Sequence, residues 1–147
     1  MTPMQSALQQ ARTAGNRGEV PVGALLLALD GTVLAQAGNE VEARSDASAH
    51  AEMLVMRAAA ARLGQTRLEG CTLVVTLEPC PMCAAAASHF RVARIIFGAY
   101  DPKGGGIEHG PRLYEQPGCL HRPQTIGGVH EQEAATLLRH FFQALRR

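Results

Sequence analysis

Two short motifs bring together one histidine, one glutamate and two cysteines. The first is His50-Ala51-Glu52, and the second is Pro79-Cys80-Pro81-Met82-Cys83. An imidazole and two thiols are typical zinc ligands, and three protein ligands leave the fourth coordination position open, as catalytic zinc sites require. The sequence therefore predicts one zinc ion bound by the histidine and both cysteines, with the Glu52 carboxylate free to move protons beside it.

The histidine motif lies at the start of a predicted helix. Apolar spacing indicates a helix over about residues 49–63, ended by Gly64. His50 falls in its first turn, and Glu52 projects about 200° further around the helix axis. We therefore expect His50 to bind the metal while Glu52 reaches past it to the open side.

The two cysteines lie at the start of another predicted helix. It runs from Met82 to about His89 and follows Pro81, which a first helical turn tolerates. Because they are three residues apart, Cys80 and Cys83 can point at one place, and the partial positive charge of a helix N-terminus favours thiolates. We expect both sulfurs to bind the same zinc ion as the histidine.

Other interpretations of the cysteine pair remain open. A C-x-x-C motif can be a redox pair, and a structural zinc site needs a fourth protein ligand. Cys71, at the start of a predicted strand, and Cys119 and His121, in a distant loop, are candidates for that ligand. We favour a catalytic zinc because each motif opens a predicted helix.

The rest of the pattern predicts an α/β domain with helices on both faces of a mixed sheet. Strands are expected at residues 20–29, 32–37, 71–76 and 93–97, and further helices at residues 3–14 and 131–145. Residues 40–48 are expected to be irregular, with Asp46 and Ser48 as candidate helix caps. Residues 107–124 are expected to form loops with one helical turn. Residues 1–147 are expected to form one domain.

Composition narrows the class of protein. The chain has 147 residues, of which 46% are hydrophobic and 18% charged, so it suits one domain with a substantial core. Its formal net charge of +1 does not indicate a strongly basic nucleic-acid binder. No apolar run approaches the roughly 20 residues of a membrane span, and residues 1–6 do not resemble a signal peptide. We therefore expect a cytoplasmic protein with reduced thiols.

The two motifs, in this order, resemble the zinc-dependent cytidine and nucleoside deaminase superfamily. Within it, the chain is similar to bacterial tRNA-specific adenosine deaminases over nearly its full length. The similar stretches are residues 19–24, 38–39, 49–52, 76–80, 97–99, 101–103, 117–118 with 121–122, and Phe141-Phe142 with Arg146-Arg147.

This resemblance implies a three-layer cytidine-deaminase-like fold, with a five-stranded mixed sheet between helices, assembled as a homodimer. It also implies one zinc ion per chain, Glu52 as the proton shuttle, and hydrolytic deamination of adenosine to inosine at the wobble position of tRNA, with the base extruded from the anticodon loop. The implied substrate contacts are Asn39 with the base, Val22 and the Ala51 backbone on the pocket wall, and Asp101 and His121 near the flanking sugar-phosphate.

Two alternative functions remain. The chain could be a deaminase of a free base or nucleoside, such as guanine, cytosine or cytidine, on the same scaffold. It could also be a zinc-stabilised binding module without turnover. Ammonia release distinguishes an enzyme from a binding module, and competition between a tRNA anticodon stem-loop and free bases distinguishes the two enzymes.

Overall fold

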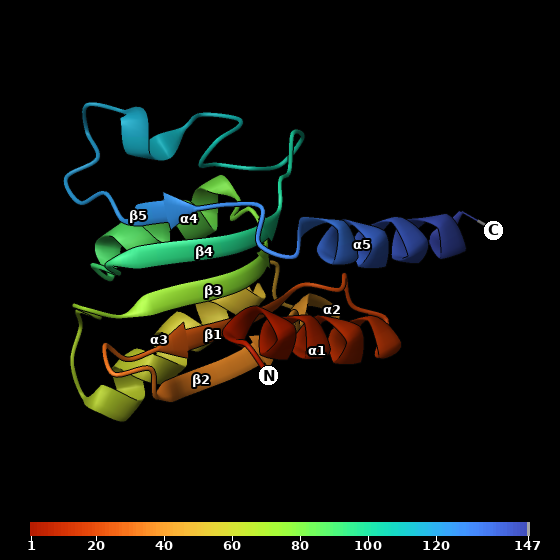
Figure 1. Cartoon of the computed structure of the whole chain (residues 1–147), viewed down its shortest axis with the longest axis horizontal. Helices are drawn as coiled ribbons and strands as arrows, with labels where there is room; N and C mark the ends of the chain where they lie inside the picture. Colours follow the sequence, from red (N-terminus) through yellow and green to blue (C-terminus); the bar gives the residue numbers. More distant parts are fainter. Residues whose placement is uncertain (147) are drawn as a thin grey trace.

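A five-stranded sheet forms the centre of the computed structural model, which describes residues 1–146 (Figure 1). The strands are β1 (Gly23–Leu27), β2 (Val33–Gly38), β3 (Thr72–Leu77), β4 (Arg94–Ala99) and β5 (Gln124–Ile126). They lie in the order β2-β1-β3-β4-β5, with β1 antiparallel to both its neighbours and β3, β4 and β5 parallel. The expected five-stranded mixed sheet is confirmed.

Helices cover both faces of this sheet. They are α1 (Pro3–Asn16), α2 (Val41–Arg44), α3 (Ala51–Leu63), α4 (Pro81–His89), the short 3-10 helix η1 (Leu113–Glu115) and α5 (Glu131–Leu145). α1 and α5 pack on one face, and α3 and α4 pack on the other (Figure 1). The three-layer fold is therefore confirmed. None of the helices described in residues 1–146 has the length and apolarity needed to cross a membrane.

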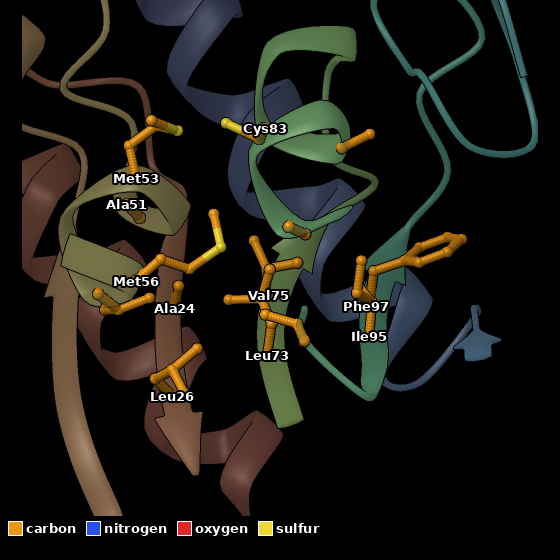
Figure 2. Packing of buried hydrophobic residues seen from close by; sticks show 14 of the residues in the cluster. Ala24, Leu26, Ala51, Met53, Met56, Leu73, Val75, Cys83, Ile95 and Phe97 are labelled. Carbon is orange, nitrogen blue, oxygen red and sulfur yellow. The ribbon is translucent and has the colours of Figure 1, made fainter. Parts of the chain in front are cut away.

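β1 is buried along its whole length, as its apolar sequence predicts. Its side chains alternate between the two faces of the sheet. Ala24 and Leu26 pack in the larger cluster beneath α3 (Figure 2), and Leu25 and Leu27 pack in the smaller cluster beneath α1. The strand thus holds the two helical layers together through alternate residues.

Two glycines let α1 approach the sheet closely. Gly23 and Gly38 are register partners in β1 and β2. A Cβ on Gly23 would lie 2.6 Å from a backbone nitrogen of α1, and a Cβ on Gly38 would lie 2.7 Å from an α1 carbonyl oxygen. The adjacent residues, Val22 and Asn39, are joined by a backbone hydrogen bond of 3.0 Å. Close packing of α1 therefore helps to fix these two candidate substrate contacts.

Some local expectations were wrong or incomplete. Residues 40–48 are not wholly irregular, because they contain α2, and α3 begins at Ala51 rather than at residue 49. The apolar pattern indicated four strands and did not locate β5, a three-residue edge strand with no buried residue. Arg147, the last residue of the expected closing motif, lies outside the described residues.

Candidate active site

The candidate site lies at one end of the strands, where β2, β3 and β4 end and β1 begins. Asn39 follows β2, Cys80 follows β3 by three residues, Asp101 follows β4 by two, and Val22 precedes β1. In α/β proteins, ligands commonly bind outside the carboxyl ends of the strands. The topology thus brings residues from distant parts of the sequence to one side of the molecule.

His50, Cys80 and Cys83 converge on one point. The Nδ1 atom of His50 lies 3.7 Å from Cys80 Sγ and 3.5 Å from Cys83 Sγ, and all three ligand atoms lie within 4.8 Å of one another. A tetrahedral zinc ion with ordinary bond lengths separates its nitrogen and sulfur ligands by about 3.6 Å. The three side chains therefore fit zinc by donor type and by spacing.

The first two ligands occupy the N-cap positions of their helices. His50 caps α3 and Cys80 caps α4, both with extended backbones, and neither side chain makes a capping hydrogen bond. The His50 imidazole and the Cys80 thiol are therefore free to bind a metal. The expectation that Asp46 or Ser48 would cap α3 was wrong, because Ser48 donates its backbone N–H and its hydroxyl to Asp46 Oδ1 in the turn before the helix.

The electrostatics of the cluster favour a cation. Contact with the Cys83 thiol lowers the pKa of Cys80 to about 4, and the same contact raises the pKa of Cys83. Hydrogen bonding to Cys80 raises the pKa of His50. A bound divalent ion would allow both sulfurs to ionise. Figure 2 shows the Cys83 side chain leaving α4 on the side that faces α3.

Glu52 is the second unusual feature of the site. It lies in the first turn of α3, its residue is only 4% exposed, and burial raises the pKa of its carboxyl to about 7. Its Oε1 atom is the only buried side-chain nitrogen or oxygen among residues 1–146 that has no hydrogen-bond partner. Buried polar atoms are nearly always satisfied, and an exception needs an explanation. A water or substrate atom at this position would supply the partner.

A cavity of about 620 Å³ opens beside these residues. Apolar, polar and charged side chains all line it. Its lining includes Val22, Asn39, His50, Glu52, Cys80, Asp101, Phe141, Phe142 and Leu145. The three α5 residues had not been assigned to the site from the sequence. Their only sequence signal was the closing stretch that resembles the deaminases.

The comparisons with known proteins agree with this geometry. Residues 2–99 match the family model for the cytidine and deoxycytidylate deaminase zinc-binding region. The chain is 52% identical to the tRNA-specific adenosine deaminase of Agrobacterium fabrum, over 97% of this chain and 93% of that protein. The chain belongs to the tRNA-specific adenosine deaminase family. It is also 44% identical to the tRNA-specific adenosine deaminase of Bacillus subtilis, over 98% of this chain and 89% of that protein.

A solved structure shows the same fold for this family. It comes from a study of A-to-I editing by tRNA:A34 deaminases at the wobble position of transfer RNA. It superimposes with a TM-score of 0.91 and 51% sequence identity, over 92% of this chain and 98% of that one. The zinc-dependent deaminase fold, predicted from the two motifs, therefore extends over nearly the whole chain.

The other expected residues are placed as follows. Asn39 and Asp101 line the cavity together with Val22. Ala51 is fully buried and is not among the residues that line the cavity, and its backbone N–H donates to Asn39 Oδ1 at 2.8 Å. His121 does not line the cavity. Its Nε2 atom bonds the carbonyl oxygen of Val92 at 2.7 Å, near the start of β4 and therefore at the opposite end of the strands.

No fourth zinc ligand is found within residues 1–146. The only cluster of three or more candidate ligands in this part of the chain is the one formed by the two motifs. Cys119 Sγ contacts the carbonyl oxygen of His121 at 3.2 Å, and Cys71 Sγ lies 3.8 Å from the carbonyl oxygen of Glu69. The three-ligand arrangement is that of a catalytic rather than a structural zinc site.

Proposed function

We propose that this protein deaminates adenosine to inosine at the wobble position of tRNA. One observation carries the proposal: His50 and Cys80 of the three-ligand cluster line the same cavity as Glu52, whose Oε1 atom has no hydrogen-bond partner. This arrangement lies in a chain 52% identical to a tRNA-specific adenosine deaminase. The overall reaction consumes one water and releases one ammonia.

Zinc is the cofactor of this reaction, and His50, Cys80 and Cys83 would hold it. When bound, zinc acts as a Lewis acid that lowers the pKa of a coordinated water towards neutrality. The two sulfurs and the imidazole also fix the starts of α3 and α4, because His50 and Cys80 are the N-cap residues. Metal binding and the shape of the site are therefore coupled.

Glu52 carries the proton transfers. Its carboxylate accepts one proton from the attacking water and delivers it to N1 of adenine. It then accepts the second proton, from the hydroxyl group now on C6, and delivers it to the departing amine, so that the C6–N bond breaks as the C6 carbonyl forms. Because Glu52 is buried, bulk water does not compete for these protons. Its free Oε1 atom is available for the first transfer.

Asn39 and the cavity walls orient the base. The Oδ1 atom of Asn39 is engaged by the Ala51 N–H, so its Nδ2 group is left to donate a hydrogen bond to the substrate. Val22 lines the cavity with an apolar side chain, and Asp101 lines it from the loop that follows β4. His121, at the opposite end of the sheet, has no role in this cavity.

The carrier of the adenine is a tRNA anticodon loop rather than a free nucleoside. The cavity continues from the zinc ligands to the exposed end of α5, where Phe142 is 43% and Leu145 is 66% exposed. Exposed aromatic rings beside a pocket suit the unstacked bases of a single-stranded loop. A free base would not need this apolar extension.

The decisive experiment is incubation of the zinc-loaded protein with total tRNA, followed by mapping of inosine. Inosine confined to the wobble position supports the proposal. A strong preference for free guanine, cytosine or cytidine over an anticodon stem-loop would favour the alternative deaminase. If no ammonia is released from any tRNA, nucleoside or base, the binding-module alternative stands.

We also propose that residues 1–147 form one domain and that two chains assemble as a homodimer in the cytoplasm. The small side chains of α4 support a close interface. Ala85 and Ser88 line a second hollow of about 390 Å³, beside Leu120, which is 87% exposed. Sedimentation of the wild type against Leu120→Glu tests the dimer.

A further inference from the structure

A second buried carboxylate, Glu78, lies between the zinc motif and the wall of the cavity. It precedes the ligand Cys80 by two residues, and its side chain is 0% exposed. The proposed chemistry does not use it. Burying a carboxylate is costly unless hydrogen bonds compensate it, so its partners indicate what it does.

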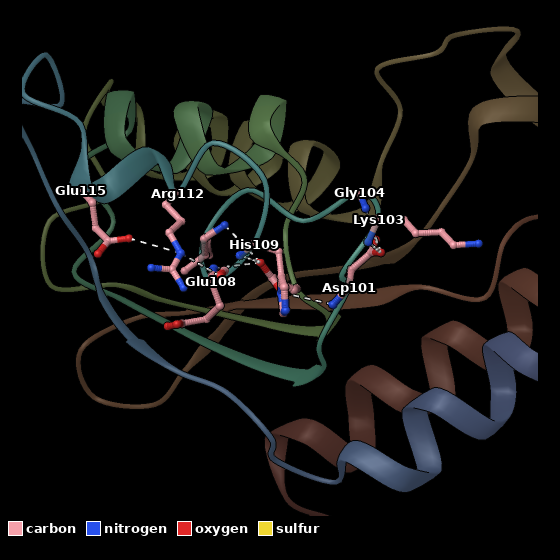
Figure 3. A network of polar contacts seen from close by, with 9 residues as sticks. Asp101, Lys103, Gly104, Glu108, His109, Arg112 and Glu115 are labelled. Atoms are coloured by element: carbon pink, nitrogen blue, oxygen red, sulfur yellow. Dashed lines mark hydrogen bonds and ion pairs between the residues drawn. The ribbon is translucent and has the colours of Figure 1, made fainter.

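All hydrogen-bond partners of its side chain lie in residues 101–109, in the loop that follows β4. Glu78 Oε2 accepts the backbone N–H groups of Ile107, Glu108 and His109 at 3.2, 2.9 and 3.1 Å. Glu78 Oε1 accepts the backbone N–H of Asp101 at 3.1 Å and bonds Nδ1 of His109 at 2.8 Å. Figure 3 shows the loop side of this network, with Asp101, Glu108 and His109 labelled.

The loop wraps directly over Glu78 because two of its residues are glycines. A Cβ on Gly105 would collide with Glu78 Oε2, and a Cβ on Gly106 would lie 2.7 Å from the backbone nitrogen of Pro81. The Gly106 N–H also donates to the carbonyl oxygen of Pro79 at 2.8 Å. The loop is therefore held against both the carboxylate and the start of α4.

The same loop shapes the cavity. Asp101 and Gly104 line it, and the Asp101 Oδ1 atom accepts the N–H groups of Lys103 and Gly104 at 3.2 and 2.9 Å. The direction of the Asp101 side chain thus follows the path of the loop. Glu78 sets that path by accepting the Asp101 backbone N–H.

The partners of Glu78 favour its ionised form. Its two oxygens accept four backbone N–H groups, and one of them also faces the ring nitrogen of His109. N–H donors around a carboxylate favour its charged form. Charge-assisted bonds of this kind are stronger than those between neutral groups, so the contact fixes the loop firmly.

We infer that Glu78 is a positioning residue, whose carboxylate holds the loop of residues 101–109. The loop in turn fixes Asp101 and Gly104 in the cavity wall and thereby controls how well the substrate is bound. This inference rests on the proposed function, since it concerns the same substrate. The two buried carboxylates then have different roles. Glu52 transfers protons, and Glu78 fixes the loop against which the substrate lies.

The test is Glu78→Gln in the zinc-loaded protein, with a tRNA anticodon stem-loop as substrate. The amide oxygen of glutamine can still face the N–H groups of residues 107–109. Its NH₂ group then faces the Asp101 N–H, which loses its acceptor. We expect KM to rise about tenfold and kcat to change by less than about twofold, as for a lost substrate-positioning contact. Zinc content should stay at one ion per chain.

Glu115→Gln is the matched control, because it makes the same chemical change in the same connection on a side chain that is 64% exposed. Its kinetic constants should equal those of the wild type. A fall in kcat or in zinc content for Glu78→Gln, with KM unchanged, would show a merely structural role and overturn the inference.

His109→Ala and amide hydrogen exchange give an independent measurement. The variant removes the side-chain partner of Glu78 Oε1 and leaves the backbone donors in place. We expect faster exchange confined to residues 101–109, and a KM effect that is less than additive with Glu78→Gln. Unchanged exchange there in both variants refutes the inference. Exchange needs no substrate, so this result is separable from a failure of the wild type to deaminate tRNA.

Discussion

The side chain of Asn39 is bonded to the backbone of Ala51, whose N–H donates to Asn39 Oδ1 at 2.8 Å. The bond joins the end of β2 to the first residue of α3, next to Glu52. It also identifies which end of the amide faces the cavity, because only the oxygen can accept. Asn39 therefore braces the start of α3 and presents an NH₂ donor to the substrate.

Replacing Asn39 by aspartate separates these two tasks. Asn39→Asp keeps an acceptor for the Ala51 N–H and removes the donor, so we expect kcat/KM to fall about 10- to 100-fold, as when a buried polar contact is lost. Zinc content should be unchanged. Asn16→Asp, at the exposed end of α1, is the matched control. Wild-type kcat/KM in Asn39→Asp would show that the base is held by other groups.

Glu52→Gln tests the proton shuttle. We expect the rate of ammonia release to fall at least about 100-fold, as when a general acid–base group is lost. Elemental analysis should still find one zinc ion per chain. The Tm should not fall, because a neutral amide is easier to bury than a carboxylate with an unpartnered oxygen.

The control for this variant is Glu69→Gln, since Glu69 is 70% exposed on the surface. It should match the wild type in ammonia release and Tm. Loss of zinc from Glu52→Gln alone would mean that the carboxylate is a metal ligand, and the assignment of the shuttle would then be wrong.

The chemical centre was predictable because its signals are local. The spacing of His50 and Glu52, and of Cys80 and Cys83, is a property of two short segments that begin helices. What the spacing does not contain is that the segments meet. They meet because β2 and β3 end at the same edge of the sheet, a consequence of β1 lying antiparallel between them.

Capping rules failed at the site for a physical reason. These rules identify a helix start by Ser, Thr, Asp or Asn before the first helical residue. Here the N-cap residues are His50 and Cys80, whose side chains make no capping hydrogen bond and are proposed to bind the metal. At α2 the acceptor comes from far away in the sequence. Buried Glu19 accepts the N–H groups of Glu42 and Ala43 at 3.0 and 2.9 Å. No local pattern marks such a contact.

The task of Glu78 was hidden for the same reason. Four of its contacts are to backbone N–H groups of residues 101 and 107–109. Backbone groups carry no residue-type signal, and these lie 23 to 31 positions further along the chain. The sequence did not assign Phe141, Phe142 and Leu145 of α5 to the cavity wall, because the apolar face of that helix predicts core packing equally well.

The zinc ligands can be tested by replacing sulfur with oxygen. In Cys80→Ser and in Cys83→Ser we expect loss of stoichiometric zinc and a lower Tm, because metal binding stabilises the folded chain. The Tm of each variant should no longer respond to a chelator, whereas that of the wild type should fall. Cys119→Ser should keep its zinc, since Cys119 Sγ contacts Ser88 Oγ at 3.7 Å away from the cluster. Full zinc content in either ligand variant would require a different ligand set.

Phe142 tests whether the end of α5 takes part in substrate binding. Its ring lies against that of Phe141 in an edge-to-face pair with centroids 5.4 Å apart, and it remains 43% exposed on the cavity wall. Because stacking of a base on an aromatic ring contributes about 1–3 kcal/mol, Phe142→Ala should raise KM for an anticodon stem-loop about tenfold. The free energy of unfolding should change by less than about 0.5 kcal/mol, as for other exposed positions. Leu29→Ala, at a residue 87% exposed in the turn between β1 and β2, is the control for loss of apolar surface. An unchanged KM in Phe142→Ala would place the bound RNA away from α5.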